Sequence, residues 1–198
     1  MKFLFDLGGV FFDWNPRFFF KNIIEDSNKL NFFLTNVCND EWNIKQDAGR
    51  SVKEAEEDLI KKYPNYSTYI KLYYLNHHKM IIKTFDSSIM ALKELKKNKI
   101  SCFALSNWSS ETFVGMLEEF PFLDDFDDII ISGDVKLVKP DAKIYNLAIK
   151  KFSLIPENTV FIDDKIENIQ AAEKLEFKTI HLTDPFKIYE EIKRYLNF

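Results

Sequence analysis

The sequence contains few of the residues that mark several classes of protein. Only two of its 198 residues are cysteine, and Cys38 and Cys102 lie far apart and outside any CxxC pair, so they indicate no disulfide framework. We interpret both as buried thiols, which favours a reducing, cytoplasmic environment. Glycine (5 residues) and proline (6 residues) are also scarce, and the chain shows no flexible linker, internal repeat or low-complexity segment.

The chain also lacks a surplus of basic residues and a long apolar run. Its formal net charge is −4, which offers no basic surface for a nucleic acid. Asp6 and Asp13 interrupt the apolar N-terminus, which a secretory signal peptide does not tolerate, and no apolar run approaches the length of a membrane span. We therefore expect a cytoplasmic protein that binds neither nucleic acid nor a membrane.

Apolar and aromatic residues are plentiful. Hydrophobic residues make up 46% of the sequence and 20 residues are phenylalanine, enough for the core of one domain with an inserted subdomain. Apolar runs that end at polar residues or glycine predict buried strands at residues 2–6, 100–106, 128–132, 159–163 and 179–182. Helical patterns separate them, at residues 86–98, 110–119, 141–151 and 166–175. This alternation predicts an α/β fold with a mostly parallel sheet.

Residues 15–85 have a different pattern. Asn15-Pro16 is a good helix start, with the asparagine as cap and the proline at the first helical position. From there the pattern stays helical, and no convincing strand occurs. We therefore expect residues 1–14 and 86–198 to form the core, and residues 15–85 to form a helical cap inserted after the first strand.

Polar residues at the ends of the predicted strands carry the candidate chemistry. In an open parallel sheet, ligands bind outside the carboxyl ends of the strands. The residues found there are Asp6, Ser106-Asn107 and Asp163-Asp164, and Lys139-Pro140 precedes the helix that follows the third strand. Three acids, a hydroxyl and a lysine at one edge predict a site for Mg²⁺ and a phosphoryl group.

Four segments make this prediction more specific. FLFDLGGV, ALSN, VKPD and FIDDKIEN follow one another in the chain and resemble the four motifs of the haloacid dehalogenase (HAD) superfamily. The match is best to the DLGGV/DLGNV branch of subfamily IA, which includes phosphatases acting on glucose 1-phosphate. The resemblance implies a three-layer αβα Rossmann-like parallel sheet with an inserted all-helical type-1 cap. It also implies a Mg²⁺-dependent phosphatase that hydrolyses a small phosphorylated metabolite, with sugar phosphates as candidates, and a monomer or homodimer.

The resemblance assigns a nucleophile and a metal site. Asp6 matches the nucleophile, whose carboxylate attacks phosphorus and becomes an aspartyl phosphate. Asp6, Asp164 and the Gly8 carbonyl match the Mg²⁺ ligands. Asp163 belongs to the same metal set, which it and Asn168 would orient.

The remaining motif residues match groups that bind the phosphoryl oxygens. Ser106 and the backbone amide of Asn107 would donate hydrogen bonds to them. Lys139 would neutralise charge on the nucleophile and on the transition state. Phosphoryl transfer needs such groups because it is catalysed mainly by positioning and electrostatics.

One position departs from the family pattern. The usual motif is Asp-x-Asp, in which the second acid protonates the leaving group and then activates water, but this chain has Gly8 there. General acid–base catalysis contributes about 10²–10⁴-fold, so another group has to replace that acid. Asp13, on the segment leading into the cap, is the sequence-based candidate.

Three further residues are candidates for substrate contact. Arg50 follows Gly49 between two predicted cap helices, where it either faces the substrate or ends a helix at the surface. Trp14 and Trp108 adjoin motif residues and are candidates for walls of the pocket, whereas Trp42 is expected in the core of the cap.

Two other functions are compatible with this pattern. A 2-haloacid dehalogenase shares the fold and the aspartate nucleophile but needs no metal, and the pair Asp163-Asp164 beside Asp6 would then repel without a cation. A non-catalytic binding protein with the same fold would account for Gly8. Such a protein would be expected to lose the nucleophile or the metal acids as well, and this chain retains both.

Overall fold

A parallel sheet forms the centre of the computed structural model, which describes residues 1–196. Within these residues the strands β1 (Lys2–Phe5), β4 (Ser101–Ser106), β5 (Asp128–Ile131), β6 (Thr159–Asp163) and β7 (Lys178–His181) pair in the order β5-β4-β1-β6-β7. Every neighbouring pair is parallel. These strands match the five predicted from apolar runs. β1 is the central strand, so its carboxyl end has a neighbouring strand end on each side.

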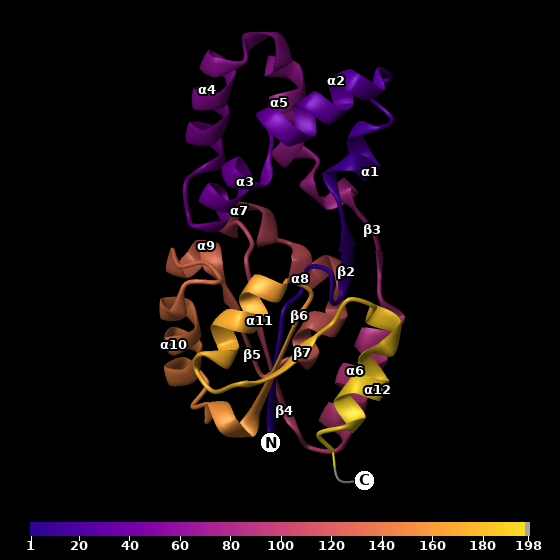
Figure 1. Ribbon diagram of the computed structural model, residues 1–198. Coiled ribbons are helices and arrows are strands. Elements are labelled where there is room, and N and C mark those ends of the chain that lie inside the picture. Colours follow the sequence, from indigo (N-terminus) through magenta and orange to yellow (C-terminus); the bar gives the residue numbers. More distant parts are fainter. Residues whose placement is uncertain (197–198) are drawn as a thin grey trace.

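Helices cover both faces of this sheet, as Figure 1 shows. On one face lie α6 (Asp86–Lys97) and α12 (Ile188–Lys193), and on the other lie α10 (Ala142–Lys151) and α11 (Ile166–Glu173). β1 alternates between the two layers, because Phe3 and Phe5 pack in the core under α6 and α12 while Leu4 packs in the core under α10 and α11. The three-layer α/β fold expected from the sequence is confirmed.

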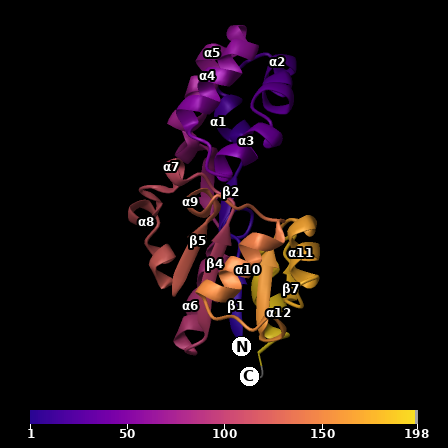
Figure 2. The ribbon, with the colours of Figure 1, turned by 90° about the vertical axis from the view of Figure 1, so that its left-hand side faces the viewer.

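A second group of helices lies above the carboxyl ends of the strands (Figure 2). It consists of α1 (Pro16–Phe20), α2 (Ser27–Phe32), a π-helical turn at Phe33–Val37, α3 (Asp40–Asp47), α4 (Val52–Lys62) and α5 (Ser67–Leu75). As predicted, Asn15 caps α1, and its side chain accepts a hydrogen bond from the Arg17 amide. These helices share a core of their own, in which Trp42 is buried with Phe20, Phe33 and Tyr73. We call residues 16–80 the cap.

The expectation that residues 15–85 contain no strand is wrong at their end. β3 (Ile81–Thr84) pairs antiparallel with β2 (Phe12–Trp14), and these two strands carry the chain into and out of the cap. Each strand is too short to show a reliable alternation by itself. The pairing depends on a partner about seventy positions away, which no local pattern reveals.

The helix predicted at residues 110–119 is also interrupted. The chain forms two short helices, α7 (Ser110–Phe113) and α8 (Met116–Glu119), separated by Val114 and Gly115. Gly115 adopts a left-handed conformation with φ +89°, which ends the first helix and is accessible to glycine at little cost. A further short helix, α9 (Ser132–Val135), follows β5 directly.

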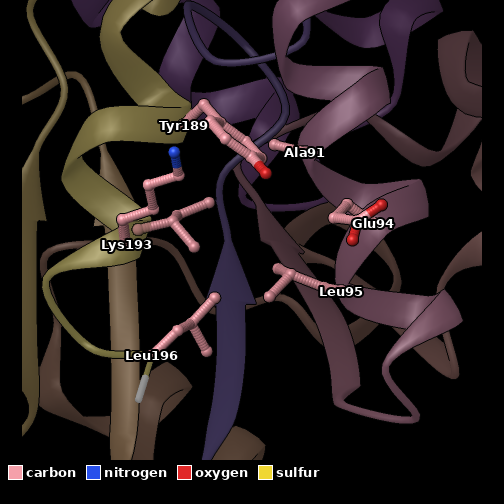
Figure 3. A pocket seen from close by; sticks show the side chains of 7 residues that line it. Ala91, Glu94, Leu95, Tyr189, Lys193 and Leu196 are labelled. Carbon is pink, nitrogen blue, oxygen red and sulfur yellow. The ribbon is translucent and has the colours of Figure 1, made fainter. Parts of the chain in front are cut away.

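One small cavity lies between α6 and α12, away from the strand ends (Figure 3). Its volume of about 10 Å³ is room for roughly one water molecule. The residues that line it include Ala91, Leu95 and Tyr189, none of which is a candidate site residue. We interpret it as a packing gap. Among the described residues, no helix has both the length and the apolar character needed to cross a membrane.

Candidate active site

The carboxyl ends of the central strands bring three acids together. Asp6 follows β1, and Asp163 and Asp164 lie at the end of the neighbouring β6. Each of the three offers a carboxylate oxygen, and these oxygens lie within 4.8 Å of one another. The Asp6 amide donates to the Ile162 carbonyl (2.8 Å), which continues the β1–β6 ladder and sets the position of the Asp6 side chain.

A buried lysine links two of these acids. Lys139 Nζ lies 2.9 Å from Asp6 Oδ1 and 2.6 Å from Asp163 Oδ2, and only 2% of the residue is exposed. Burial alone would lower the pKa of Lys139, but the attraction of Asp163 and Asp6 outweighs it and raises that pKa. The lysine is therefore a fixed positive charge beside the candidate nucleophile.

Asp163 is fully occupied by hydrogen bonds. Its Oδ1 accepts from the Lys165 amide (2.8 Å) and from Asn168 Nδ2 (3.0 Å), and its Oδ2 accepts from Lys139 Nζ (2.6 Å) and from Asn168 Nδ2 (3.0 Å). A carboxylate with both oxygens engaged in this way orients its neighbours better than it binds a cation. The structure therefore favours the orienting role predicted for Asp163 and Asn168 over a place for Asp163 among the metal ligands.

Asp6 has hydrogen-bond donors against only one of its two carboxylate oxygens within residues 1–196. Its Oδ1 accepts from the Leu7 amide (2.7 Å) as well as lying against Lys139, whereas its Oδ2 accepts no hydrogen bond from residues 1–196. Burial raises the pKa of Asp6 to about 7, with Lys139 lowering it and the nearby Asp163 and Asp164 raising it further.

The balance of charge at this edge of the sheet fits a divalent cation. Within residues 1–196 the three carboxylates have one ion-paired ammonium group, that of Lys139, which contacts Asp6 and Asp163. Burial and then Asp163 raise the pKa of Asp164, Lys165 and Lys139 lower it, and no basic side chain of the described residues is hydrogen-bonded to it. Uncompensated carboxylates in a buried cluster are costly. Hard oxygen donors of this kind suit Mg²⁺, which binds through one or two carboxylates together with carbonyl, water and phosphate oxygens.

Asn107 holds the backbone of the lysine. Its Nδ2 donates to the Lys139 carbonyl and its Oδ1 accepts from the Lys139 amide, both at 2.9 Å. The predicted phosphate contact of Asn107 uses its backbone amide, so this pair of side-chain bonds is an additional, positioning role. Ser106, 1% exposed at the end of β4, lies at the same edge of the sheet.

The loop after Asp6 requires glycine at only one of its two positions. Gly9 has φ +68°, and a Cβ there would lie 2.4 Å from Asp164 Oδ2. A Cβ at Gly8 would meet no heavy atom of the described residues within 4 Å. A side chain would therefore fit at position 8, so lack of space does not explain why the second acid of the family motif is absent there.

The cap reaches the strand ends through the end of α3, which packs against α9 (Figure 1). The hydroxyl of buried Ser132 donates to the Asp47 carbonyl (2.6 Å) and accepts from the Trp108 amide (2.9 Å). One serine thus joins the cap to the loop that carries Ser106 and Asn107. The sequence analysis did not single out Asp47 or Ser132, although Asp47 directly precedes the Ala48-Gly49-Arg50 turn.

Gly49 and Arg50 complete this contact. Gly49, with φ +93°, ends α3, and a Cβ there would lie 2.8 Å from Cγ of Lys136 in the core. Arg50 Nε donates to Gln46 Oε1 (2.7 Å), while its Nη2 is buried and has no hydrogen-bond partner among residues 1–196. The segment ends a helix, as one of the two interpretations expects, and the contact of Arg50 with a substrate stays a prediction.

Both candidate tryptophans pack against His77. The ring centroids of Trp14 and Trp108 are each 5.6 Å from that of His77. Burial lowers the pKa of His77 to about 4, so this ring is neutral. A cleft of about 250 Å³ adjoins His77. It lies between Tyr74, His77 and His78 of the cap and residues 111–119 of the core.

Asp13 is directed to another partner. It lies on β2, and its carboxylate is 3.8 Å from the ammonium of Lys83 on β3. It does not belong to the cluster of Asp6, Asp163 and Asp164. The structure therefore gives no support to Asp13 as the replacement acid.

Comparisons with known proteins show the family of the chain. A family model described as haloacid dehalogenase-like hydrolase matches residues 4–182. The chain is 24% identical over 191 residues to the sesquiterpene phosphatase astK of Aspergillus oryzae, covering 96% of this chain and 94% of that protein. It is 24% identical over 102 residues to an (S)-2-haloacid dehalogenase of Pseudomonas sp. strain YL, covering 52% of this chain and 44% of that enzyme.

A solved structure shows the same fold. The magnesium complex of a HAD family enzyme from Bacteroides thetaiotaomicron matches with a TM-score of 0.75 at 20% identity, over 98% of each chain. Phosphatases and dehalogenases thus both occur among the relatives. The chemistry of the site, rather than the fold, has to distinguish between them.

The two glycines after the nucleophile are expected to respond differently to alanine. Gly9→Ala should cost about 1–2 kcal/mol in the free energy of unfolding through its left-handed backbone and should weaken Mg²⁺ binding at least tenfold by displacing Asp164. Gly8→Ala should change the free energy of unfolding by less than about 1 kcal/mol and retain Mg²⁺ binding. Denaturant titration and calorimetry test both; equal effects of the two substitutions would contradict the loop geometry.

Ser132→Ala should loosen the contact between cap and core. The buried Trp108 amide loses its acceptor, which should cost about 1–3 kcal/mol. Hydrogen exchange should also become faster in residues 40–50. Ser87→Ala is the matched control, because Ser87 Oγ donates to the Pro185 carbonyl (2.9 Å) away from the cap. Unchanged exchange in residues 40–50 of the Ser132 variant would show that the serine does not hold the cap.

Proposed function

The chain belongs to the haloacid dehalogenase-like hydrolase family, and we propose that it is a Mg²⁺-dependent phosphatase that hydrolyses a small phosphorylated metabolite through a phosphorylated Asp6. The observation that supports this most is the cluster of Asp6, Asp163 and Asp164 around the buried Lys139 at the carboxyl end of the sheet. A hydrolase that handles a dianionic phosphoryl group needs this combination of acids and a fixed cation.

Asp6 is the nucleophile in this proposal. Its Oδ1 is held by the Leu7 amide and Lys139, which fixes the rotation of the carboxylate. Its Oδ2 is free of hydrogen bonds from residues 1–196 and attacks phosphorus in line with the leaving oxygen. In a second step, water attacks the same phosphorus and releases phosphate from Asp6.

The other motif residues stabilise the phosphoryl oxygens and the metal site. Lys139 would neutralise charge next to the nucleophile, and the Ser106 hydroxyl and the Asn107 amide would donate hydrogen bonds to the phosphoryl oxygens. Asp6, Asp164 and the Gly8 carbonyl would hold Mg²⁺, which when bound supplies positive charge to the phosphoryl oxygens. Asp163 and Asn168 keep Lys139 and the loop after β6 in position.

The charge of the site disfavours a dehalogenase. A dehalogenase of this fold needs no metal, so within residues 1–196 Lys139 would be the only cation ion-paired with the three clustered carboxylates. Burial, and to a smaller extent the neighbouring Asp163 and Asp164, raises the pKa of Asp6 to about 7, whereas a carboxylate nucleophile has to be ionised. A cation in the site removes this conflict.

The substrate of the proposed phosphatase is an organic phosphate. The DLGGV branch resemblance and the sesquiterpene phosphatase relative both favour an organic phosphate monoester, and sugar phosphates are the first candidates to assay. The buried and unpaired Nη2 of Arg50 offers a donor to a polar substrate. Trp14 and Trp108 remain candidates for the walls of the substrate site.

Loss of the cation or of its ligands should abolish turnover. Wild type should hydrolyse p-nitrophenyl phosphate with Mg²⁺ and lose that activity in excess chelator. Asp6→Asn and Asp164→Ala should lower kcat by at least about 10³-fold, because they remove the nucleophile and a metal ligand. The exposed Asp124→Ala serves as the control and should retain full activity. Full activity in chelator would contradict the proposed phosphatase and favour the dehalogenase.

A further inference from the structure

The proposed phosphatase needs a proton donor that its nucleophile loop does not provide. When a P–O bond to an alkyl leaving group breaks, the leaving oxygen takes the bonding electron pair and needs a proton. Gly8 has no side chain to supply it. Asp163 and Asp164 belong to the charged cluster around the nucleophile, and Asp13 lies against Lys83.

Asp47 is the remaining buried acid at this edge of the sheet among residues 1–196. It is the last residue of α3 and is 8% exposed. Its carbonyl accepts from Ser132 Oγ (2.6 Å), which also accepts from the Trp108 amide (2.9 Å). Through Ser132, the Asp47 backbone is therefore hydrogen-bonded to the segment that follows the phosphate-binding candidates Ser106 and Asn107.

The carboxylate of Asp47 faces the core across the boundary with the cap. The Ser109 backbone and Lys165, the residue after Asp164, stabilise its charged form, and Asp6 destabilises that form. Its Oδ2 accepts from Asn43 Nδ2 (3.1 Å), and the Asn43 Oδ1 accepts from the Tyr74 hydroxyl (2.8 Å). This chain of hydrogen bonds fixes the rotation of the Asp47 side chain.

The surroundings of Asp47 favour a carboxyl group that gains and loses its proton near neutral pH. Burial raises the pKa of Asp47 to about 7, with Lys165 and the Ser109 backbone lowering it and Asp6 raising it. Tyr74 and Tyr73, which face it from α5, have pKa values raised by burial and stay neutral. General acid–base groups work best when their pKa lies close to the working pH.

On this geometry, and resting on the phosphatase function, we propose that Asp47 of the cap is the general acid and base of the reaction. In the first step the Asp6 oxygen forms a bond to phosphorus, the bond to the leaving oxygen breaks, and the Asp47 proton passes to that oxygen. In the second step water attacks phosphorus, its proton returns to Asp47, and the bond to Asp6 breaks. The products are an alcohol and inorganic phosphate, and both acids are regenerated.

The open space at Gly8 is consistent with this arrangement. A side chain there would meet no described heavy atom within 4 Å, so the volume that the family's second acid fills is free. A leaving group can occupy that volume and be approached from the cap side. The acid then comes from an element that also encloses the substrate, so proton transfer requires the cap to be in contact with the core.

The experiment compares two substrates in two charge-matched variants. Asp47→Asn keeps the shape of the side chain and removes the proton, and Asp40→Asn makes the same change at the exposed first residue of the same helix. kcat/KM, which reports the steps up to phosphorylation of Asp6, is measured with Mg²⁺ for p-nitrophenyl phosphate and for glycerol 3-phosphate.

The Asp47 variant should lose much more kcat/KM on one substrate than on the other. Asp47→Asn should lower kcat/KM for glycerol 3-phosphate by about 10²–10⁴-fold, and for p-nitrophenyl phosphate by less than about tenfold, because nitrophenolate leaves without a proton. The same variant should release a burst of about one equivalent of nitrophenolate, since water attack on the aspartyl phosphate has lost its base. Asp40→Asn should stay within about twofold on both substrates.

Two other outcomes have different meanings. If Asp47→Asn slows both substrates equally and shows no burst, Asp47 only supports the site and the inference is overturned while the phosphatase function stands. If wild type hydrolyses neither substrate in the presence of Mg²⁺, the phosphatase function fails and the inference fails with it. Thermal unfolding of both variants shows whether any loss arises from folding.

Discussion

The ion pairs of Lys139 are the interaction on which the rest of the site depends. The lysine is withdrawn from water and held against Asp6 and Asp163, so it offsets part of the repulsion among three clustered acids. Its backbone is held by the side chain of Asn107, and its partner Asp163 is held by Asn168. These neighbours of the nucleophile leave one Asp6 oxygen free for chemistry.

The second constraint is the contact between the cap and the core. Ser132 bridges the Asp47 carbonyl and the Trp108 amide, and Gly49 approaches Lys136 so closely that a side chain would collide. The strand pair β2–β3 supports the cap at its other end. In the role proposed for Asp47, proton transfer requires these contacts, which would couple enclosure of the substrate to proton transfer.

Much of the core could be predicted from the chain alone. The central strands β1, β4 and β6 appear as apolar runs because both of their faces are buried, and the candidate motif residues Asp6, Asn107 and Asp164 follow those runs directly. The break at Gly115 and the pair β2–β3 were missed. One is a backbone conformation inside an otherwise helical pattern, and the other joins two short segments about seventy positions apart in the chain.

The class of fold, the family and the candidate site residues Asp6, Lys139 and Asp164 could be predicted from the sequence alone, since local apolar periodicity and fixed motifs carry that information. Tertiary structure alone decided that Asp13 turns to Lys83 and that Asp47 lies at the strand ends. The bond that places Asp47 joins residues 85 positions apart. A carboxylate's burial and charged neighbours, which decide whether it can exchange a proton, exist only once such distant segments meet.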